Sequence, residues 1–354
     1  MRIVYNSWYG RYSDNPKAIY EALLRRGDSH EHTWLADPGR EGGFPAGTTT
    51  VAIDSPAAIE VLESADLVVS DVHIELEWTK KPGATYVQTW HGTPLKRVHH
   101  DVLLAPDGLL DWLSLDVDRW DVLLSPNAYS TEMLRRAFRW EGTVLETGYP
   151  RNDVLLSPNA ETIRTRVRRS LGIEEGRLAV LYAPTWRDDT YFENGADASV
   201  AVALDGQVAE ALDCVFLVRL HGKILGGLAG AQQGWIDVTS YPDIAELYLA
   251  ADVMVTDYSS AMFDFAVTGK PLALYAYDLE RYAAEVRGFY FDLSLDPPGP
   301  MVSTQDELIG QLSDLDRMRK QYGEAYERFQ QKFCYLEDGH AAERLLERLV
   351  PRSA

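Results

Sequence analysis

Residues 252–275, DVMVTDYSSAMFDFAVTGKPLALY, decide the fold class of this chain. The stretch begins with a short apolar run at 254–256, passes through a polar turn into a helical run at 261–267, and ends in a second apolar run at 272–275. A helix between two strands is the crossover that parallel pairing requires. The stretch therefore predicts a strand–helix–strand unit of a parallel sheet.

The same alternation runs through the rest of the chain. Further strands are expected at residues 2–5, 67–70, 85–89, 122–125, 178–182 and 215–219. Helices are expected at 16–26, 56–64, 130–138, 162–171, 201–212 and 244–250, and the tail 306–349 has helical periodicity. Together these patterns predict an α/β protein whose doubly wound parallel sheets are covered by helices on both faces.

The length predicts two domains. The chain has 354 residues, and a single core stops growing at roughly 250–300 residues. A turn-rich segment at 148–170 separates the two sets of strands. We expect Rossmann-like domains at 1–160 and 161–354, with the terminal helix packing back on the first domain.

Charge and cysteine content exclude several classes of protein. The 34 Lys and Arg residues against 54 Asp and Glu give a net charge of −20. A chain this acidic repels phosphate backbones, so no nucleic-acid partner is expected. The two cysteines, Cys214 and Cys334, form no metal-binding or disulfide pattern, which is typical of a reducing compartment. With no long apolar segment, a cytoplasmic protein is expected.

Common catalytic motifs are absent from the sequence. It contains no GxGxxG or GxxxxGK[ST] phosphate loop, no HExxH and no GxSxG. Ligands of open parallel sheets bind outside the carboxyl ends of the strands. We therefore look for chemistry in the segments that follow the predicted strands.

The strand at 85–89 is followed by Trp90, His91, Gly92 and Thr93. A histidine at a strand end is placed to act as a general base, and the glycine beside it allows close backbone approach. A hydrogen-bonded turn histidine is the alternative interpretation, but the surrounding signature favours function.

Two further strand ends carry cations and hydroxyls. Arg219 and His221 alternate at the end of the strand 215–219, where they could bracket a pyrophosphate or form an ordinary charged strand end. Thr185 and Arg187 follow the strand 178–182, and Arg187 could instead pair with a neighbouring aspartate.

The last strand end is the polar turn of the opening stretch. Thr256 and Asp257 end the strand, and Ser259 and Ser260 precede the helical run. Hydroxyls and backbone N–H groups at a helix start can face an anion, although a serine there can also be only an N-cap.

Five segments together resemble the CDP-glycerol glycerophosphotransferase family, which makes the poly(glycerol phosphate) linkages of teichoic acids and related bacterial surface polymers. They are QTWHGTPLK at 88–96, TGYPRNDVL at 147–155, YAPTWRDD at 182–189, RLHGK at 219–223 and DVMVTDYSSAMFDFAVTGKPLALYAYDLE at 252–280. The tail FCYLEDGHAAERL at 333–345 is similar to the family's ending. The first sixty or so residues carry none of these motifs.

The resemblance implies a glycosyltransferase-B-like fold, with a cleft between an acceptor-side domain and a donor-binding domain. It implies transfer of glycerol phosphate from CDP-glycerol to a lipid-linked or polyol phosphate acceptor, with release of CMP. His91 becomes the base and His221 the second essential histidine. The expected substrate contacts are Trp90, Gly92, Thr93, Thr185, Arg187, Arg219, Thr256, Asp257, Ser259 and Ser260.

Several alternatives stay open on the sequence. The donor could be CDP-ribitol or a nucleotide sugar, or the chain could be a non-catalytic CDP-polyol-binding subunit of a polymer synthase. An epimerase of similar fold is disfavoured, because the motifs are those of the transferases. No carboxylate cluster demands a metal, which leaves open a diffusible magnesium ion on the donor pyrophosphate.

The expected acceptor raises the question of membrane contact. Family members are usually peripheral membrane enzymes with basic patches, and the acidic charge departs from that pattern. The densest positive charge is the group Arg164, Arg166, Arg168 and Arg169. This helix could give weak, salt-sensitive docking on the cytoplasmic face of a membrane, or its arginines could be solvated or form interdomain ion pairs.

Overall fold

The computed structural model describes residues 1–39, 43–103, 108–185, 202–221, 228, 230, 232–286 and 288–350. The chain forms two compact units. Unit 1 comprises Met1–His91, Val98–Asp153 and Tyr335–Ala354, and unit 2 comprises Gly92–Arg97 and Val154–Cys334. The main passage of the chain from unit 1 to unit 2 follows Asp153, a few residues before the domain boundary expected at residue 160.

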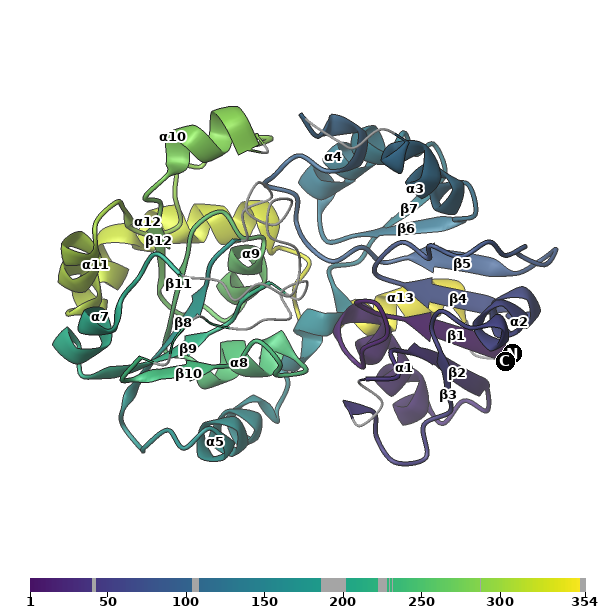
Figure 1. Ribbon diagram of the computed structural model, residues 1–354, viewed down its shortest axis with the longest axis horizontal. Helices are drawn as coiled ribbons and strands as arrows, with labels where there is room; N and C mark the ends of the chain where they lie inside the picture. Colours follow the sequence, from purple (N-terminus) through teal and green to yellow (C-terminus); the bar gives the residue numbers. More distant parts are fainter. Residues whose placement is uncertain are drawn as a thin grey trace. The chain divides into compact units, whose positions relative to one another are not determined.

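Unit 1 contains a seven-stranded, all-parallel sheet in the order β3-β2-β1-β4-β5-β6-β7 (Figure 1). Its strands are β1 (Arg2–Asn6), β2 (Glu31–Ala36), β3 (Thr50–Ala52), β4 (Leu67–Ser70), β5 (Thr85–Gln88), β6 (Val122–Ser125) and β7 (Thr143–Glu146). Its helices are α1 (Asp14–Arg26), α2 (Pro56–Ser64), η2 (His99–Asp101), α3 (Leu109–Val117), α4 (Ala128–Phe138) and α13 (Ala341–Leu349), and η3 (Pro150–Leu156) begins in this unit.

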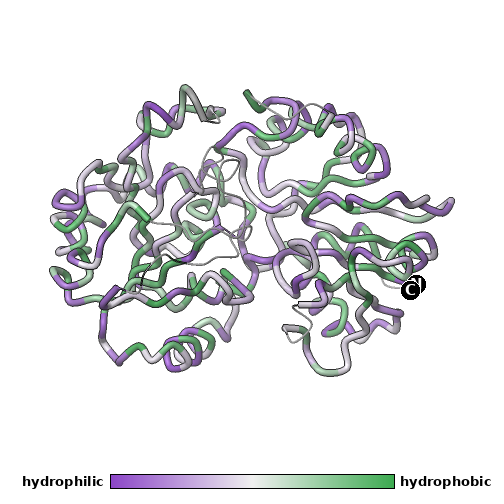
Figure 2. The backbone as a smooth tube through the Cα atoms, in the orientation of Figure 1, coloured by the Kyte–Doolittle hydropathy of each residue, from purple (hydrophilic) through white to green (hydrophobic). Residues whose placement is uncertain are grey.

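Helices cover both faces of the unit 1 sheet because its strands are apolar on both sides. Ile3 and Tyr5 pack in one cluster with residues of α1 and α13. Val4, between them, points to the other face and packs with residues of α2 and α4. The residues along these strands are accordingly mostly hydrophobic and buried (Figure 2).

Unit 2 contains a six-stranded parallel sheet in the order β10-β9-β8-β11-β12-β13. Its strands are β8 (Leu178–Ala183), β9 (Cys214–Val218), β10 (Trp235–Asp237), β11 (Val253–Thr256), β12 (Leu272–Tyr275) and β13 (Met301–Val302). Its helices are α5 (Ala160–Ser170), α7 (Gly206–Ala211), α8 (Ile244–Ala250), α9 (Ala261–Ala266), α10 (Leu279–Arg281), η4 (Tyr282–Val286), α11 (Gln305–Leu312) and α12 (Leu315–Phe333).

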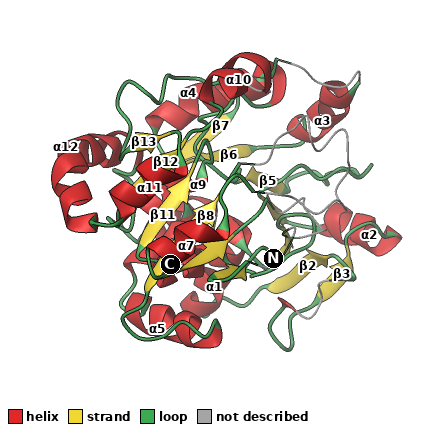
Figure 3. Ribbon diagram, turned by 60° about the vertical axis from the view of Figure 1, so that its left-hand side comes forward, coloured by secondary structure: helices red, strands yellow, loops and turns green. Residues whose placement is uncertain are grey.

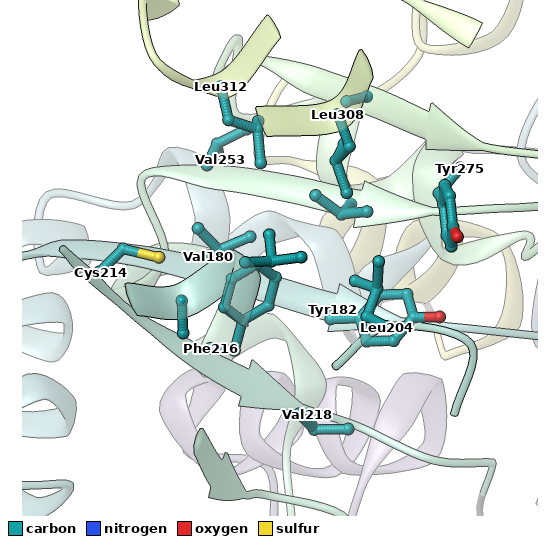
Figure 4. Close-up of a cluster of buried hydrophobic side chains, with 14 of the residues drawn as sticks. Val180, Tyr182, Leu204, Cys214, Phe216, Val218, Val253, Tyr275, Leu308 and Leu312 are labelled. Atoms are coloured by element: carbon teal, nitrogen blue, oxygen red, sulfur yellow. The ribbon is translucent and has the colours of Figure 1, made fainter. Parts of the chain in front are cut away.

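One core cluster of unit 2 lies between the sheet and the helices α7 and α11. Val180, Phe216 and Val253 from three strands pack with Leu308 and Leu312 of α11 (Figure 4). Strands surrounded by helices recur throughout the chain (Figure 3). The expected α/β class with doubly wound parallel sheets is therefore confirmed.

All eight expected strands and the expected helices are present, most with shifted ends. Within the described residues, five strands, β2, β3, β7, β10 and β13, and the helices α3 and α10 were not expected from the sequence. The helix expected at 201–212 begins only at Gly206, where the Asp205 side chain accepts the Gln207 N–H, and residue 201 lies outside the described residues. The periodic tail forms three helices, and Asp314 caps the second of them by accepting the Arg317 N–H.

Candidate active site

The segment after β5 makes a sharp turn before His91. Trp90 has a φ of 52°, in the left-handed region that a tryptophan rarely adopts. Its N–H donates to Gln88 Oε1 at 2.9 Å, and its carbonyl accepts from Asn15 Nδ2 at 3.1 Å. These bonds stabilise the turn that carries the histidine.

The imidazole of His91 is fixed in one tautomer. Its Nδ1 lies 2.5 Å from the backbone carbonyl of Asp71. A carbonyl can only accept, so Nδ1 carries the proton and Nε2 is the acceptor of the neutral ring. The indoles of Trp8 and Trp90 lie against this ring, with centroids at 4.7 and 4.2 Å.

Burial lowers the pKa of His91 to about 4, although the hydrogen bond to the Asp71 carbonyl acts in the opposite direction. The ring is therefore neutral near pH 7. Nε2 accepts no hydrogen bond from any residue that the structure describes. A neutral imidazole with a fixed Nδ1–H can take up a proton at Nε2.

Asp71, which follows β4, is a part of the site that the sequence analysis missed. Its fully buried carboxylate accepts from Ser7 Oγ at 2.7 Å and from the Trp8 N–H at 3.0 Å. Burial raises the pKa of this carboxyl well above its usual value. Ser7 and Trp8 follow β1, so the strand-end rule that found His91 also points to all three residues.

Gly92 and Thr93 belong to unit 2, so the chain passes between units at the His91–Gly92 peptide bond. A Cβ atom on Gly92 would lie 2.7 Å from Ser260 Oγ and 3.0 Å from Ser260 Cβ. Glycine is required here because the backbone lies against that serine. The structure thus places Gly92 against Ser260, although the two residues are far apart in the sequence. Thr93, next to Gly92, is buried.

Thr256 and Asp257 join the ends of two strands. Thr256 Oγ1 donates to the carbonyl of Ala183 in β8 at 2.7 Å. Asp257 Oδ1 accepts from the Thr185 N–H at 2.8 Å and from the Tyr258 N–H at 2.6 Å. These hydrogen bonds therefore hold the end of β8 and the segment after it against the end of β11. They involve three of the expected substrate contacts, Thr256, Asp257 and Thr185.

Ser259 and Ser260 precede α9. Ser260 is the N-cap residue, and its side chain makes no capping bond. Ser259 Oγ accepts from the Ala261 N–H at 3.3 Å. Both serines are partly buried. They lie at the start of this helix, as the sequence predicted.

Arg219 and His221 lie just beyond the end of their strand, which stops one residue earlier than expected. β9 ends at Val218. Arg219 Nη1 donates to the carbonyl of Val238, at 2.9 Å, and to that of Tyr241, and burial lowers the pKa of this guanidinium. Arg219 thus holds the loop after β10. His221 is partly buried two residues further on, and Arg187 lies outside the described residues.

The arginines of α5 bind the end of α8. Arg164 Nη1 donates to the carbonyls of Leu249, Ala250 and Ala251 at 2.9–3.1 Å, and its Nη2 lies 2.5 Å from Asp252 Oδ1. Arg168 also binds Asp252 and the Ala250 carbonyl, and Arg166 pairs with Glu246. Three of the four arginines are thus engaged in ion pairs, and these pairs lie within unit 2 rather than between domains.

Among the described residues, no group of three or more His, Cys, Asp or Glu side chains is arranged to hold a metal ion. No helix within the described ranges has the length and apolar character that crossing a bilayer requires.

Comparisons with known proteins agree with the sequence motifs. A family model described as CDP-glycerol:poly(glycerophosphate) glycerophosphotransferase matches residues 1–351, including the first sixty. A teichoic acid glycerol-phosphate transferase from Staphylococcus aureus is 38% identical over 98% of this chain and 92% of its own length.

A longer protein is similar as well. The teichoic acid poly(glycerol phosphate) polymerase from Staphylococcus epidermidis is 36% identical over 96% of this chain, and the match spans 49% of that polymerase. The chain thus spans about half the length of this relative.

A solved structure confirms the fold class. The wall teichoic acid polymerase TagF is 34% identical, with a TM-score of 0.88, over 98% of this chain and 88% of that one. Together with the two parallel sheets, this likeness makes the fold glycosyltransferase-B-like.

Proposed function

Because the chain belongs to the CDP-glycerol:poly(glycerophosphate) glycerophosphotransferase family, we propose that it transfers glycerol phosphate from CDP-glycerol to a hydroxyl of a lipid-linked or polymeric acceptor. CMP is the second product. The observation that supports this most directly is the imidazole of His91, with its proton on Nδ1 and Nε2 as the acceptor.

In the proposed reaction, His91 Nε2 takes the proton of the acceptor hydroxyl while the hydroxyl oxygen attacks the β-phosphorus. The new P–O bond forms as the bond to the bridging oxygen breaks, and CMP leaves with that electron pair. General-base help of this kind contributes about 10²–10⁴-fold. The turn that holds the ring supplies its orientation.

The remaining groups stabilise negative charge in this proposal. Ser259, Ser260 and His221 of unit 2 donate to the phosphoryl oxygens and the departing CMP, and Arg187 is assigned the same role from the sequence. Arg219 contributes by fixing the loop whose carbonyls it binds. Mg²⁺ enters only as an ion carried by the donor pyrophosphate.

The acceptor and the place of the reaction are also proposals. A lipid-linked acceptor puts the reaction at the cytoplasmic face of the cell membrane. The engaged arginines of α5 do not supply the membrane contact. Any such contact uses another surface and is weak.

The test is to incubate the purified protein with a crude membrane acceptor and CDP-glycerol, CDP-ribitol or a UDP-sugar in parallel. We expect CMP release with CDP-glycerol at a rate well above that with CDP-ribitol, and no UDP release. Incorporation of radiolabelled glycerol into polymer must match the CMP released.

Two results would overturn the proposal. Preference for CDP-ribitol would assign the donor to the alternative polyol. Tight CDP-glycerol binding without CMP release, in the presence of acceptor, would indicate a non-catalytic subunit.

A further inference from the structure

Both peptide carbonyls that bracket the Cα atom of His91 accept hydrogen bonds from buried side chains of unit 1. Asn15 Nδ2 donates to the Trp90 carbonyl at 3.1 Å, and Arg151 Nη1 donates to the His91 carbonyl at 2.9 Å. Asn15 is 0% exposed and Arg151 is 8% exposed. Bonds to both flanking carbonyls fix the two peptide planes, and therefore the direction in which the imidazole projects.

The two donors are tied to each other. Asn15 Oδ1 accepts from the Arg151 N–H at 3.1 Å. Arg151 Nη1 donates to Asp14 Oδ2 at 2.8 Å, and the guanidinium lies 4.7 Å from the centre of the Tyr149 ring. The segments around Asn15, His91 and Arg151 thus interlock within unit 1.

The same network holds the ring that lies against the imidazole. Asp14 Oδ2 accepts from Trp8 Nε1 at 2.9 Å, and the Trp8 indole contacts the His91 ring. One carboxylate therefore binds both the arginine behind the His91 backbone and the tryptophan beside its side chain.

Backbone strain is concentrated in this network. Trp8, Asp14 and Trp90 have φ values of 41°, 59° and 52°, all in the left-handed region. Such conformations persist only where the surroundings enforce them, and they cluster at active sites. A buried ion pair is also poor at adding stability, because desolvation offsets the attraction. The network therefore requires an explanation other than stability.

We propose that Asn15 and Arg151 are positioning residues that hold His91 in the orientation in which Nε2 reaches the acceptor hydroxyl. The inference rests on the proposed function, since that function makes His91 the base. Displacing a reacting group by about 1 Å can cost about 10²-fold in rate. Donors that fix both flanking peptide planes therefore affect the rate of the reaction by keeping the imidazole in place.

Two variants test the proposal. Asn15→Asp keeps the oxygen that accepts from the Arg151 N–H but cannot donate to the Trp90 carbonyl at neutral pH. Arg151→Lys keeps the charge but loses the planar fork. We expect each to lower kcat by at least about tenfold while KM for CDP-glycerol changes by less than about threefold, because the effect is on the transition state.

The matched control is Arg344→Lys. Arg344 is another arginine of unit 1 that donates to backbone carbonyls, those of Thr147 and Leu336. We expect this variant to keep the wild-type kcat. An equal loss of kcat in Arg344→Lys and Arg151→Lys would overturn the proposal, because the effect would then be a general loss of packing.

A second readout does not depend on turnover. In ¹⁵N-histidine spectra, the Nδ1–H signal of His91 is assigned by its absence in His91→Ala. We expect it to shift or to exchange rapidly with solvent in Asn15→Asp and Arg151→Lys, and to stay unchanged in Arg344→Lys.

Either variant tests the proposal by itself, so the test still works if the other variant does not fold. A wild-type kcat or an unchanged His91 signal in a folded Asn15→Asp or Arg151→Lys protein would overturn the proposal. If the wild type released no CMP, the proposed function would fail, and the ring signal would still decide whether Asn15 and Arg151 fix the imidazole.

Discussion

At the residue scale, the proposed chemistry depends on one nitrogen atom, Nε2 of His91. His91→Ala removes the proton acceptor and leaves the unit 2 residues in place. We expect turnover to fall by at least about a hundredfold, while CDP-glycerol affinity changes little. CMP release and calorimetric titration measure the two quantities.

The control for this variant is His340→Ala. His340 is an exposed histidine of the same unit, and its side chain contacts Glu343. It should keep wild-type turnover. Wild-type turnover in His91→Ala itself would remove His91 from the mechanism.

The low pKa of His91 predicts an unusual pH profile. The base must be neutral to act, and burial lowers its pKa to about 4. As pH falls, kcat/KM should therefore hold through about 6.5, the ordinary histidine value, and decline only as pH approaches 4. Stopped assays between pH 4 and 8, with circular dichroism to verify folding, would show this. A decline centred near 6.5 would contradict the buried, neutral ring.

Sequence patterns could place His91 and the paired serines at sheet edges because each lies shortly after a predicted strand. They could not identify Asn15 and Arg151, which are 136 positions apart and act through a contact between their segments. The structural contacts of Arg219 are a similar case. Its position near a strand end is visible in the sequence, but the carbonyls that its guanidinium binds are not.

At the scale of elements, α5 stabilises α8 from outside. The carbonyls at the end of a helix lack partners within the helix and carry partial negative charge. Arg164 donates to three of them. We expect Arg164→Gln to lower the free energy of unfolding by about 1–3 kcal/mol, because the charge-assisted hydrogen bonds from Arg164 to the three carbonyls and to Asp252 are lost.

The control for Arg164→Gln is Arg169→Gln, on the exposed side of the same helix. Urea unfolding should show no measurable loss for this control. Sedimentation with anionic vesicles should give the same binding for both variants and the wild type. A selective loss of vesicle binding in Arg164→Gln, with unchanged stability, would instead indicate that α5 contacts the membrane.

The strands whose bounds the sequence predicted correctly are buried along their whole length. β6 and β12 appear as continuous apolar runs, and the sequence predicted the bounds of both correctly. β10 and β13 have three and two residues and lie at the ends of their sheet. Strands so short offer little periodicity to detect.

At the scale of the whole molecule, the tail completes a core that begins at the first strand. Leu345 and Leu346 of α13 are buried with Ile3 and Tyr5. We expect Leu345→Ala to lower the free energy of unfolding of unit 1 by about 2–5 kcal/mol, through lost burial and the cavity that remains.

The comparison for Leu345→Ala is Glu347→Ala, at an exposed position of the same helix. Denaturant unfolding followed by tryptophan fluorescence measures both. Equal stability of the two variants would mean that α13 contributes little to the core of unit 1.

The order of the segments has a consequence for biosynthesis. The chain leaves unit 1 after Asp153 and returns only at Tyr335, so the ribosome must make all of unit 2 before α13 emerges. At about 5–20 residues per second, this delay lasts of the order of ten seconds or more. During that time the nascent first sheet exposes the apolar face that Leu345 and Leu346 later cover. Chaperones that shield such faces are therefore expected to improve the yield of native protein.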